Sequence, residues 1–559
     1  MRVLFHVLIF LVSSQLFCNR CLSQAIPDYE WVKGANSSAI NVTTAIASDS
    51  EGNVYITGNF NGSYIQFGSH GLSNSGVGMD IYLVKYDVDG NILWVKGMGG
   101  SGDDYVYALA TDQDDNVFVT GLFASSTISF GTISLNKVNS NSISDMFLAK
   151  YDAQGNTTWA RAGNGTSASN IGTGVCTDAD GNVYVGGRYS SATLNFGATV
   201  ITNTNAPGED AFIVKYNASG TDLWANTVGG SANDAAYAIA SDQDGHVFLT
   251  GFFLSEDLTI GNTVLSYIPN ANTDIFLAKY KNDGSVLWAK SANGLAQDHV
   301  FSVAADKNGD VFITGFSHSD PLIFSSSVKL NTEVGSNEVF LAKYNSSGNP
   351  LWVKSAKGAS NEFGNSLVID STGNIYLTGY FEFAPTTFGN ITLPSQGEEN
   401  AYLAIYNTHG KLLLANALGN AREIGYSIAL DHRGSVYVGG GFLSSTVDFG
   451  STTLISSGPG AVDMDMFILK MKIDPQTLVS TPRKFGFYPN PSDGIITGSF
   501  LQLDHYTLNV YSLLGKLVYR TSIYALEQEI DLSTLASGTY IFQLQNDSGT
   551  IDTEKIVID

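Results

Sequence analysis

The sequence predicts an all-β fold: a seven-bladed β-propeller closed by an N-terminal strand, followed by a smaller C-terminal β domain. A segment of about 64 residues recurs seven times between Trp31 and Lys472. Each copy contains four strand-like runs separated by Asp, Asn and Gly turns. The seventh copy lacks its fourth run, and the chain instead begins with a spare one. Repeats of this length are typical of solenoids, propellers or arrays.

Two residue types mark the period. A glycine follows the second apolar run of every copy: Gly58, Gly121, Gly187, Gly251, Gly315, Gly379 and Gly440. A large apolar residue lies near each unit's end: Trp31, Trp94, Trp159, Trp224, Trp288 and Trp352, with Leu414 in the seventh place. We expect the tryptophans to pack between blades rather than to form an exposed ligand platform, because large aromatic side chains usually contribute through packing.

The fourth copy shows the four expected strands clearly, at residues 238–241, 246–253, 274–280 and 285–290. Short β-branched and aromatic runs joined by Asp/Asn/Gly turns are hairpin signals. Four antiparallel strands per repeat form one propeller blade.

The chain ends predict how the ring closes. Residues 466–470 supply a third strand to the last copy, and residues 30–33 resemble the missing fourth strand. Pairing these two segments removes a free sheet edge. An open solenoid would need atypical caps instead. We therefore assign residues 26–475 to the propeller.

A ring of polar residues is the candidate ligand site. Eight residues before each turn aspartate, at the expected start of the first strand near the channel mouth, lie Asn41, Asp104, Asn170, Asp234, Asp298, Glu362 and Glu423. They could cap loop amides or bond to the next blade, or they could bind a cation or a cationic ligand. Calcium is thus the one cofactor left open; no other metal or cofactor is expected.

The two faces of the propeller should differ. The tight turns within each blade fall on one face, whereas the long, variable inserts between the second and third strands fall on the other. Because binding residues concentrate on loops held by a rigid scaffold, we expect a ligand on the long-loop face. The turns at Asp112 and Asp178 are similar to calcium loops, but hairpin turn chemistry explains them. Cys176 occupies an alanine register and should be buried.

The formal net charge of −24 excludes some partners. So acidic a chain repels nucleic acid and anionic lipid. Residues 1–25 have the basic start, apolar centre and small-residue end of a secretory signal peptide, and no transmembrane helix is expected. Without the signal, Cys176 is the only cysteine, so no intrachain disulfide is possible. We expect a monomer that is secreted or attached to the outer cell surface.

No catalytic motif stands out. His-Glu-x-x-His, nucleophile-elbow and Walker patterns are missing from the sequence, and the histidines do not recur at equivalent positions. Carboxylate pairs are too frequent for any one of them to be informative.

The C-terminal segment has different spacing. After a polar linker at 476–483, residues 484–559 contain a different set of turn and strand positions: Pro489, Asn490, Pro491, Gly494, Gly515, Gly538, Tyr540 and Lys555. This segment resembles the C-terminal sorting domain of type IX secretion cargo, a small Ig-like β-sandwich. The resemblance implies export by the type IX machinery, removal of the domain, and release of the product or its attachment to the surface through lipopolysaccharide.

The repeats resemble the SBBP family of β-propeller repeats. The resemblance rests on Asp-x-x-Gly-Asn-Val-Tyr-x-Thr-Gly, at 49–58, and on Phe-Leu-Ala-Lys-Tyr, at 276–280. Together these observations predict a non-catalytic propeller for binding or adhesion to glycan or protein partners. A polysaccharide-active enzyme and a structural surface-layer component are the alternatives.

Overall fold

The computed structural model describes residues 28–37, 39–140, 142–267, 272–332, 335–456, 463–473, 485–488, 492, 494–500, 506–523, 527–546 and 549–558. The predicted signal peptide (1–25), the linker (476–483) and Pro489, Asn490 and Pro491 lie outside the described residues. Every regular element in the described ranges is a β-strand, which confirms the all-β prediction. Nowhere in these ranges is there a helix with the length and hydropathy needed to cross a membrane.

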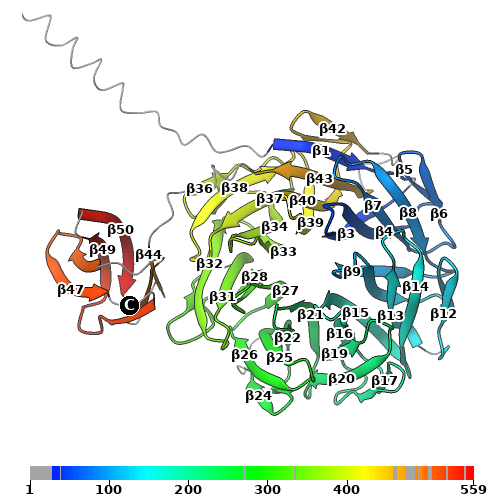
Figure 1. Cartoon of the computed structure of the whole chain (residues 1–559), viewed down its shortest axis with the longest axis horizontal. Coiled ribbons are helices and arrows are strands. Elements are labelled where there is room, and N and C mark those ends of the chain that lie inside the picture. Colours follow the sequence, from blue (N-terminus) through cyan, green and yellow to red (C-terminus); the bar gives the residue numbers. More distant parts are fainter. Residues whose placement is uncertain are drawn as a thin grey trace, which may run out of the picture.

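Seven units of four antiparallel strands make up the repeat region (Figure 1). The first three are β3 (Asn41–Ser48), β4 (Val54–Phe60), β7 (Asp80–Tyr86) and β8 (Ile92–Met98); β9 (Asp104–Thr111), β10 (Val117–Phe123), β13 (Ser142–Tyr151) and β14 (Thr157–Gly165); and β15 (Ala168–Thr177), β16 (Val183–Tyr189), β19 (Asp210–Tyr216) and β20 (Asp222–Gly229). The next three are β21 (Asp234–Ser241), β22 (Val247–Phe253), β25 (Asp274–Tyr280) and β26 (Val286–Ala292); β27 (Asp298–Ala305), β28 (Val311–Ser317), β31 (Glu338–Tyr344) and β32 (Pro350–Gly358); and β33 (Glu362–Ile369), β34 (Ile375–Glu382), β37 (Glu399–Tyr406) and β38 (Leu412–Leu418).

The seventh unit draws on both ends of the repeat region. It comprises β39 (Glu423–Leu430), β40 (Ser435–Phe442), β43 (Asp465–Lys472) and β1 (Asp28–Gly34). Strand β1 is antiparallel to β43, and Trp31 lies opposite Lys470. The expected pairing of the N-terminal strand with the last unit is confirmed.

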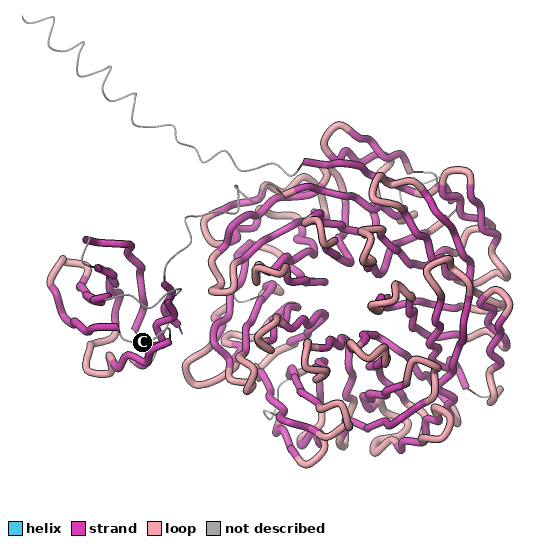
Figure 2. Tube along the Cα trace, in the orientation of Figure 1, coloured by secondary structure: helices cyan, strands magenta, loops and turns pink. Residues whose placement is uncertain are grey.

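The first strands of the units surround a common axis (Figures 1 and 2). Each contacts the first strand of the next unit, and β39 of the last unit contacts β3 of the first. The second and third strands are almost entirely buried, so the core lies between neighbouring sheets. Cys176 is buried in that core, as expected.

The inserts between the second and third strands of each unit fold as hairpins of short strands rather than as open loops. They comprise β5 (Tyr64–Phe67) and β6 (His70–Ser73), with β2 (Asn36–Ser37) alongside; β11 (Thr127–Phe130) and β12 (Ile133–Asn136); β17 (Thr193–Asn195) and β18 (Val200–Thr202); β23 (Asp257–Ile260) and β24 (Thr263–Ser266); β29 (Leu322–Ile323) and β30 (Lys329–Leu330); β35 (Thr386–Phe388) and β36 (Ile391–Leu393); and β41 (Thr446–Phe449) and β42 (Thr452–Ile455). Several pair with the fourth strand of the preceding unit, as β17 does with β14 and β23 with β20. Much of each insert is therefore tied to the outer strands.

The tryptophans join neighbouring units. The indole nitrogen of each donates to a backbone carbonyl in the next unit's turn between its third and fourth strands, at 3.0–3.3 Å: Trp31 to Val88, Trp94 to Ala153, Trp159 to Ala218, Trp224 to Asn282, Trp288 to Ser346 and Trp352 to Thr408. A turn glycine lies against each ring; a Cβ on Gly90, whose φ is +79°, would sit 2.9 Å from the Trp31 indole. The expected packing between units is confirmed.

The C-terminal segment folds as two sheets. One contains β44 (Phe485–Tyr488), β45 (Ile495–Phe500) and β48 (Glu527–Asp531); the other contains β47 (Leu517–Ile523), β46 (Tyr506–Ser512), β49 (Gly538–Asn546) and β50 (Gly549–Ile558). Both contribute to one apolar core, in which Phe487 packs against Phe542. Gly494 and Gly515 have positive φ, the Tyr540 hydroxyl donates to Ala536, and Lys555 is exposed on β50.

Candidate ligand channel

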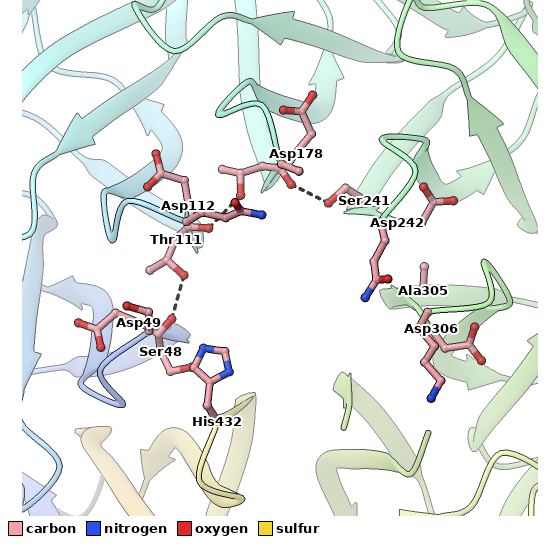
Figure 3. A pocket seen from close by; sticks show the side chains of 16 residues that line it. Ser48, Asp49, Thr111, Asp112, Asp178, Ser241, Asp242, Ala305, Asp306 and His432 are labelled. Atoms are coloured by element: carbon pink, nitrogen blue, oxygen red, sulfur yellow. Dashed lines mark hydrogen bonds between the residues drawn. The ribbon is translucent and has the colours of Figure 1, made fainter. Parts of the chain in front are cut away.

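Three cavities follow one another along the first strands. The largest, about 690 Å³, is lined by the turns between the first and second strands (Figure 3). One of about 440 Å³ is lined by the last residues of the first strands, and one of about 240 Å³ by their middle residues. Together they form an axial channel whose widest end is on the short-turn face.

The turn aspartates at this wide end serve the scaffold. In Figure 3 the carboxylates of Asp49, Asp112 and Asp178 point away from the centre. The Asp49 carboxylate accepts from the backbone N–H of Asn53 at 2.8 Å and from the Lys85 ammonium at 2.9 Å. Burial opposes its ionisation, but the hydrogen bonds from Asn53 and Lys85 hold its pKa below the usual value.

The turn carboxylates of other units bond in the same way. The Asp178 carboxylate pairs with Lys215 and accepts from the Asn182 backbone, and that of Asp112 pairs with Lys150. Each of these turn carboxylates therefore has an ammonium partner and a backbone donor within its own unit.

Hydroxyl groups line part of the same end. Ser48, Thr111, Thr177 and Ser241 each donate to the carbonyl at the equivalent position of the preceding unit. The chain of bonds stops at the fifth unit, where Ala305 replaces the hydroxyl residue.

All seven members of the predicted polar ring are buried, with exposed fractions of 0 or 1%. Six of them begin the first strand of their unit and Asn170 is the third residue of β15. Asp234 accepts from the backbone of Leu254 and from the Ser255 hydroxyl, the latter at 2.6 Å. Asp298 accepts from the hydroxyls of Ser317 and Ser319, both at 2.6 Å. These bonds hold the segment that follows the second strand.

A second buried polar set, opposite the ring, was not anticipated. It lies at or near the start of the third strands: Asp80, Asp145, Asp210, Asp274, Glu338, Asn400 and Asp465. Asn41 donates to Asp465 at 2.7 Å, and Asn170 to Asp145 at 3.2 Å. The two sets thus meet between neighbouring units. A polar residue at the start of each Phe-Leu-Ala-Lys-Tyr-like run was the available sequence signal.

Burial opposes the ionisation of several of these carboxyl groups. It raises the pKa of Asp104, Asp234 and Asp298 to about 6 and that of Glu423 to about 8. Neighbouring carboxylates act in the same direction, Asp80 on Asp104 and Asp210 on Asp234.

The channel departs from sevenfold symmetry in its aromatic residues. Five residues before each turn aspartate stand Thr44, Tyr107, Thr173, Tyr237, Phe301, Asn365 and Tyr426, all lining the 240 Å³ cavity. Further rings adjoin Tyr237 and Phe301 on the long-loop side. His299 stacks on Phe316 with ring centres 5.2 Å apart and planes at 8°. One part of the channel, in the fourth to sixth units, is therefore much richer in aromatic side chains than the part opposite.

His299 is uncharged at neutral pH and packs against this aromatic group. Burial lowers its pKa to about 4, so the ring is neutral at pH 7. It also contacts Phe252, at 4.8 Å between ring centres. Sequence reasoning missed this cluster because the aromatic residues do not recur at every unit.

Two curated proteins are similar to part of this chain. Over 452 residues, 68% of this chain, the protein is 26% identical to an uncharacterized WD repeat-containing protein of Acanthamoeba polyphaga mimivirus, of which 32% is covered. It is 25% identical over 344 residues to the regulatory protein FlaEY of Caulobacter vibrioides; this match covers 58% of the chain and 34% of FlaEY. The chain thus spans about a third of the length of these curated relatives.

Solved structures with some likeness include two from bacteria. A protein of unknown function from Dyadobacter fermentans has a TM-score of 0.34 and 10% identity, with 79% of this chain and 99% of that chain covered. PorZ, a surface component of the type IX secretion system of Porphyromonas gingivalis, has a TM-score of 0.21 and 12% identity, with 92% and 81% covered.

A family model accounts for the C-terminal segment. Residues 486–559 match the secretion system C-terminal sorting domain. This sorting tail indicates type IX export of the chain to the cell surface or the medium.

Proposed function

We propose that the protein is a non-catalytic binding or adhesion module, exported by type IX secretion, that recognises a glycan or a surface protein. Residues 26–475 would form a seven-bladed β-propeller of the SBBP type, and residues 484–559 an Ig-like β-sandwich. Support for the propeller comes from the seven units of four antiparallel strands and from the contacts between first strands around the whole ring. Support for the sandwich comes from two sheets that share one core.

The observation that carries the binding role is the contrast between two sets of residues. The buried polar residues, such as Asp234 and Asp298, are engaged with the scaffold and line none of the three cavities. The aromatic residues of the channel, such as Tyr237 and Phe301, are partly exposed and line a cavity. Cavities in which aromatic side chains lie beside polar groups that can orient a ligand are typical ligand sites. The polar ring from Asn41 to Glu423 would then support binding indirectly, by ordering the loops on the long-loop face.

A hydrolytic enzyme would need convergent acid and base groups at such a site. None of the described residues that line the 240 Å³ cavity is charged. The observations therefore favour binding over catalysis.

The test is binding of the purified full chain to a glycan array and to immobilised bacterial cell-surface extract. We expect saturable binding without release of products from the bound material. Product release would favour the polysaccharide-active enzyme. No binding to either surface would refute the proposed function.

A further inference from the structure

We propose that the aromatic part of the channel binds a neutral glycan. This inference rests on the proposed function and names its ligand class and its site. The aromatic wall is defined by Tyr237, Phe252, His299, Phe301, Phe316 and Phe363.

The aromatic wall is continuous across three units. Tyr237 on β21 contacts Phe301 on β27, with ring centres 6.0 Å apart. Phe301 contacts Phe316 on β28 at 5.7 Å, and Phe316 contacts Phe363 on β33 at 5.2 Å. The rings thus cover neighbouring first and second strands without interruption.

Two layers of rings give the aromatic wall a fixed shape. Phe252 and Phe316, on the second strands, are only 9% and 7% exposed. Tyr237, His299 and Phe301, on the first strands, are partly exposed, and Tyr237 and Phe301 line the 240 Å³ cavity. The buried rings therefore support the exposed ones, which lowers the entropic cost of binding.

The chemistry of the cavity disfavours charged ligands. No described residue that lines it carries a charge. The Arg188 guanidinium lies over the Tyr237 ring, 5.6 Å from its centre, donates to the Tyr237 hydroxyl and is paired with Glu209. His299 is neutral, and the chain's net charge of −24 opposes polyanions such as uronates.

The same cavity offers uncharged polar groups. Asn365, Thr44 and Thr173 line it together with the hydroxyl-bearing rings of Tyr107 and Tyr426. A sugar ring presents apolar C–H faces and a rim of hydroxyls. Flat aromatic faces beside amide and hydroxyl groups match both parts of such a ligand.

The sevenfold repeat supplies variants that the fold should accept. Threonine occupies the position of Tyr237 and Phe301 in the first and third units, as Thr44 and Thr173. The double variant Tyr237→Thr/Phe301→Thr thus removes two rings with residues already present at that register. Tyr64→Thr is the matched control, because Tyr64 is 46% exposed on β5, a strand of an insert hairpin.

The experiment measures binding of the full-length wild type, double variant and control to neutral glucans, mannans and xylans, to uronate polymers and to proline-rich peptides. Unfolding midpoints verify that each variant is folded. We expect the wild type and Tyr64→Thr to bind at least one neutral glycan, and the double variant to bind it at least about tenfold more weakly.

Three results would overturn the inference. They are neutral-glycan binding unchanged in the folded double variant, binding confined to uronates or peptides, and wild-type binding only to cell-surface extract. In each case the proposed binding function would stand. It would fail separately if the wild type bound none of these materials.

Discussion

The indole nitrogen of Trp31 donates a 3.2 Å hydrogen bond to the carbonyl oxygen of Val88. Trp31 belongs to the seventh unit and Val88 to the turn between β7 and β8 of the first, so this contact crosses the place where the ring closes. The one unit without a tryptophan has Leu414. This sixth unit precedes the seventh, whose third and fourth strands, β43 and β1, are not joined by a turn. No turn carbonyl is therefore placed there to accept a hydrogen bond from an indole.

Trp288→Leu should destabilise the repeat region by about 1–3 kcal/mol, because it removes buried ring area and leaves the Ser346 carbonyl without its donor. Trp288→Phe keeps most of the ring and should cost less. The measurement is denaturant unfolding followed by circular dichroism. Equal, negligible losses in both variants would show that this contact does not hold the units together.

Deleting residues 28–34 should expose the edge of β43 and lower the melting temperature. We also expect self-association, since an unpaired strand edge is a template for another chain. Calorimetry and light scattering check the two effects. A deletion variant that stays monomeric with unchanged melting would contradict the closure role of β1.

Asp234→Asn should stabilise the protein at pH 7 by about 1–3 kcal/mol. Burial raises the pKa of Asp234 to about 6, so the folded state binds its proton more tightly than the unfolded state. The resulting stability is present below pH 4 and is lost as pH rises from about 4 to about 6. Asparagine avoids that loss, and Asn41 and Asn170 already fill equivalent places.

Denaturant unfolding at pH 4 and pH 7.5 measures this difference, with Asp89→Asn, an exposed turn carboxylate, as the control. The gain should vanish at pH 4. A gain of the same size at both pH values would exclude the ionisation of Asp234 as its cause.

Calcium should shift the melting temperature by less than about 1 °C. Both oxygens of Asp298 accept hydroxyl bonds and those of Asp234 accept from Ser255, so a cation would have to displace these donors. Differential scanning calorimetry with calcium or chelator tests this. A calcium-dependent rise that disappears in Asp234→Asn/Asp298→Asn would instead support a cation-binding ring.

The effect of His299→Phe on stability should have the opposite pH dependence to that of Asp234→Asn. The pKa of His299 is lowered to about 4 by burial. Its contribution to the stability of the folded state is therefore present above pH 6.5 and is lost as pH falls toward 4. Phenylalanine cannot take up a proton, and Phe363 fills the equivalent place. We expect a gain of about 1–3 kcal/mol at pH 4 and little change at pH 7.5, by denaturant unfolding; a gain only at pH 7.5 would contradict this.

The repeated parts of the molecule could be predicted from the sequence because each residue type recurs seven times. The strands and the pairing of β1 with β43 follow from the register of Trp31 and the turn residues. The positions of Asn41 to Glu423 at or near strand starts were found in the same way, but their complete burial was not. Burial depends on what the neighbouring unit places opposite, such as Asp465 against Asn41.

The features that break the repeat could not be predicted. The aromatic wall combines Tyr237 with His299 and Phe316, which come from different units and register positions. The widest part of the channel lies on the short-turn face, although the variable inserts favoured the other face. Channel width is set by side-chain direction, as where the Asp178 carboxylate turns toward Lys215, and composition alone does not reveal that direction.

The bond between Asn41 and Asp465 joins residues that are 424 positions apart in sequence. Contacts of such separation form late, because the chain entropy lost in closing a large loop must be met before the contact is made. A chain synthesised from its N-terminus has Asn41 available long before Asp465 is made. Assembly of the ring is therefore a terminal event, completed only when the last repeat has arrived.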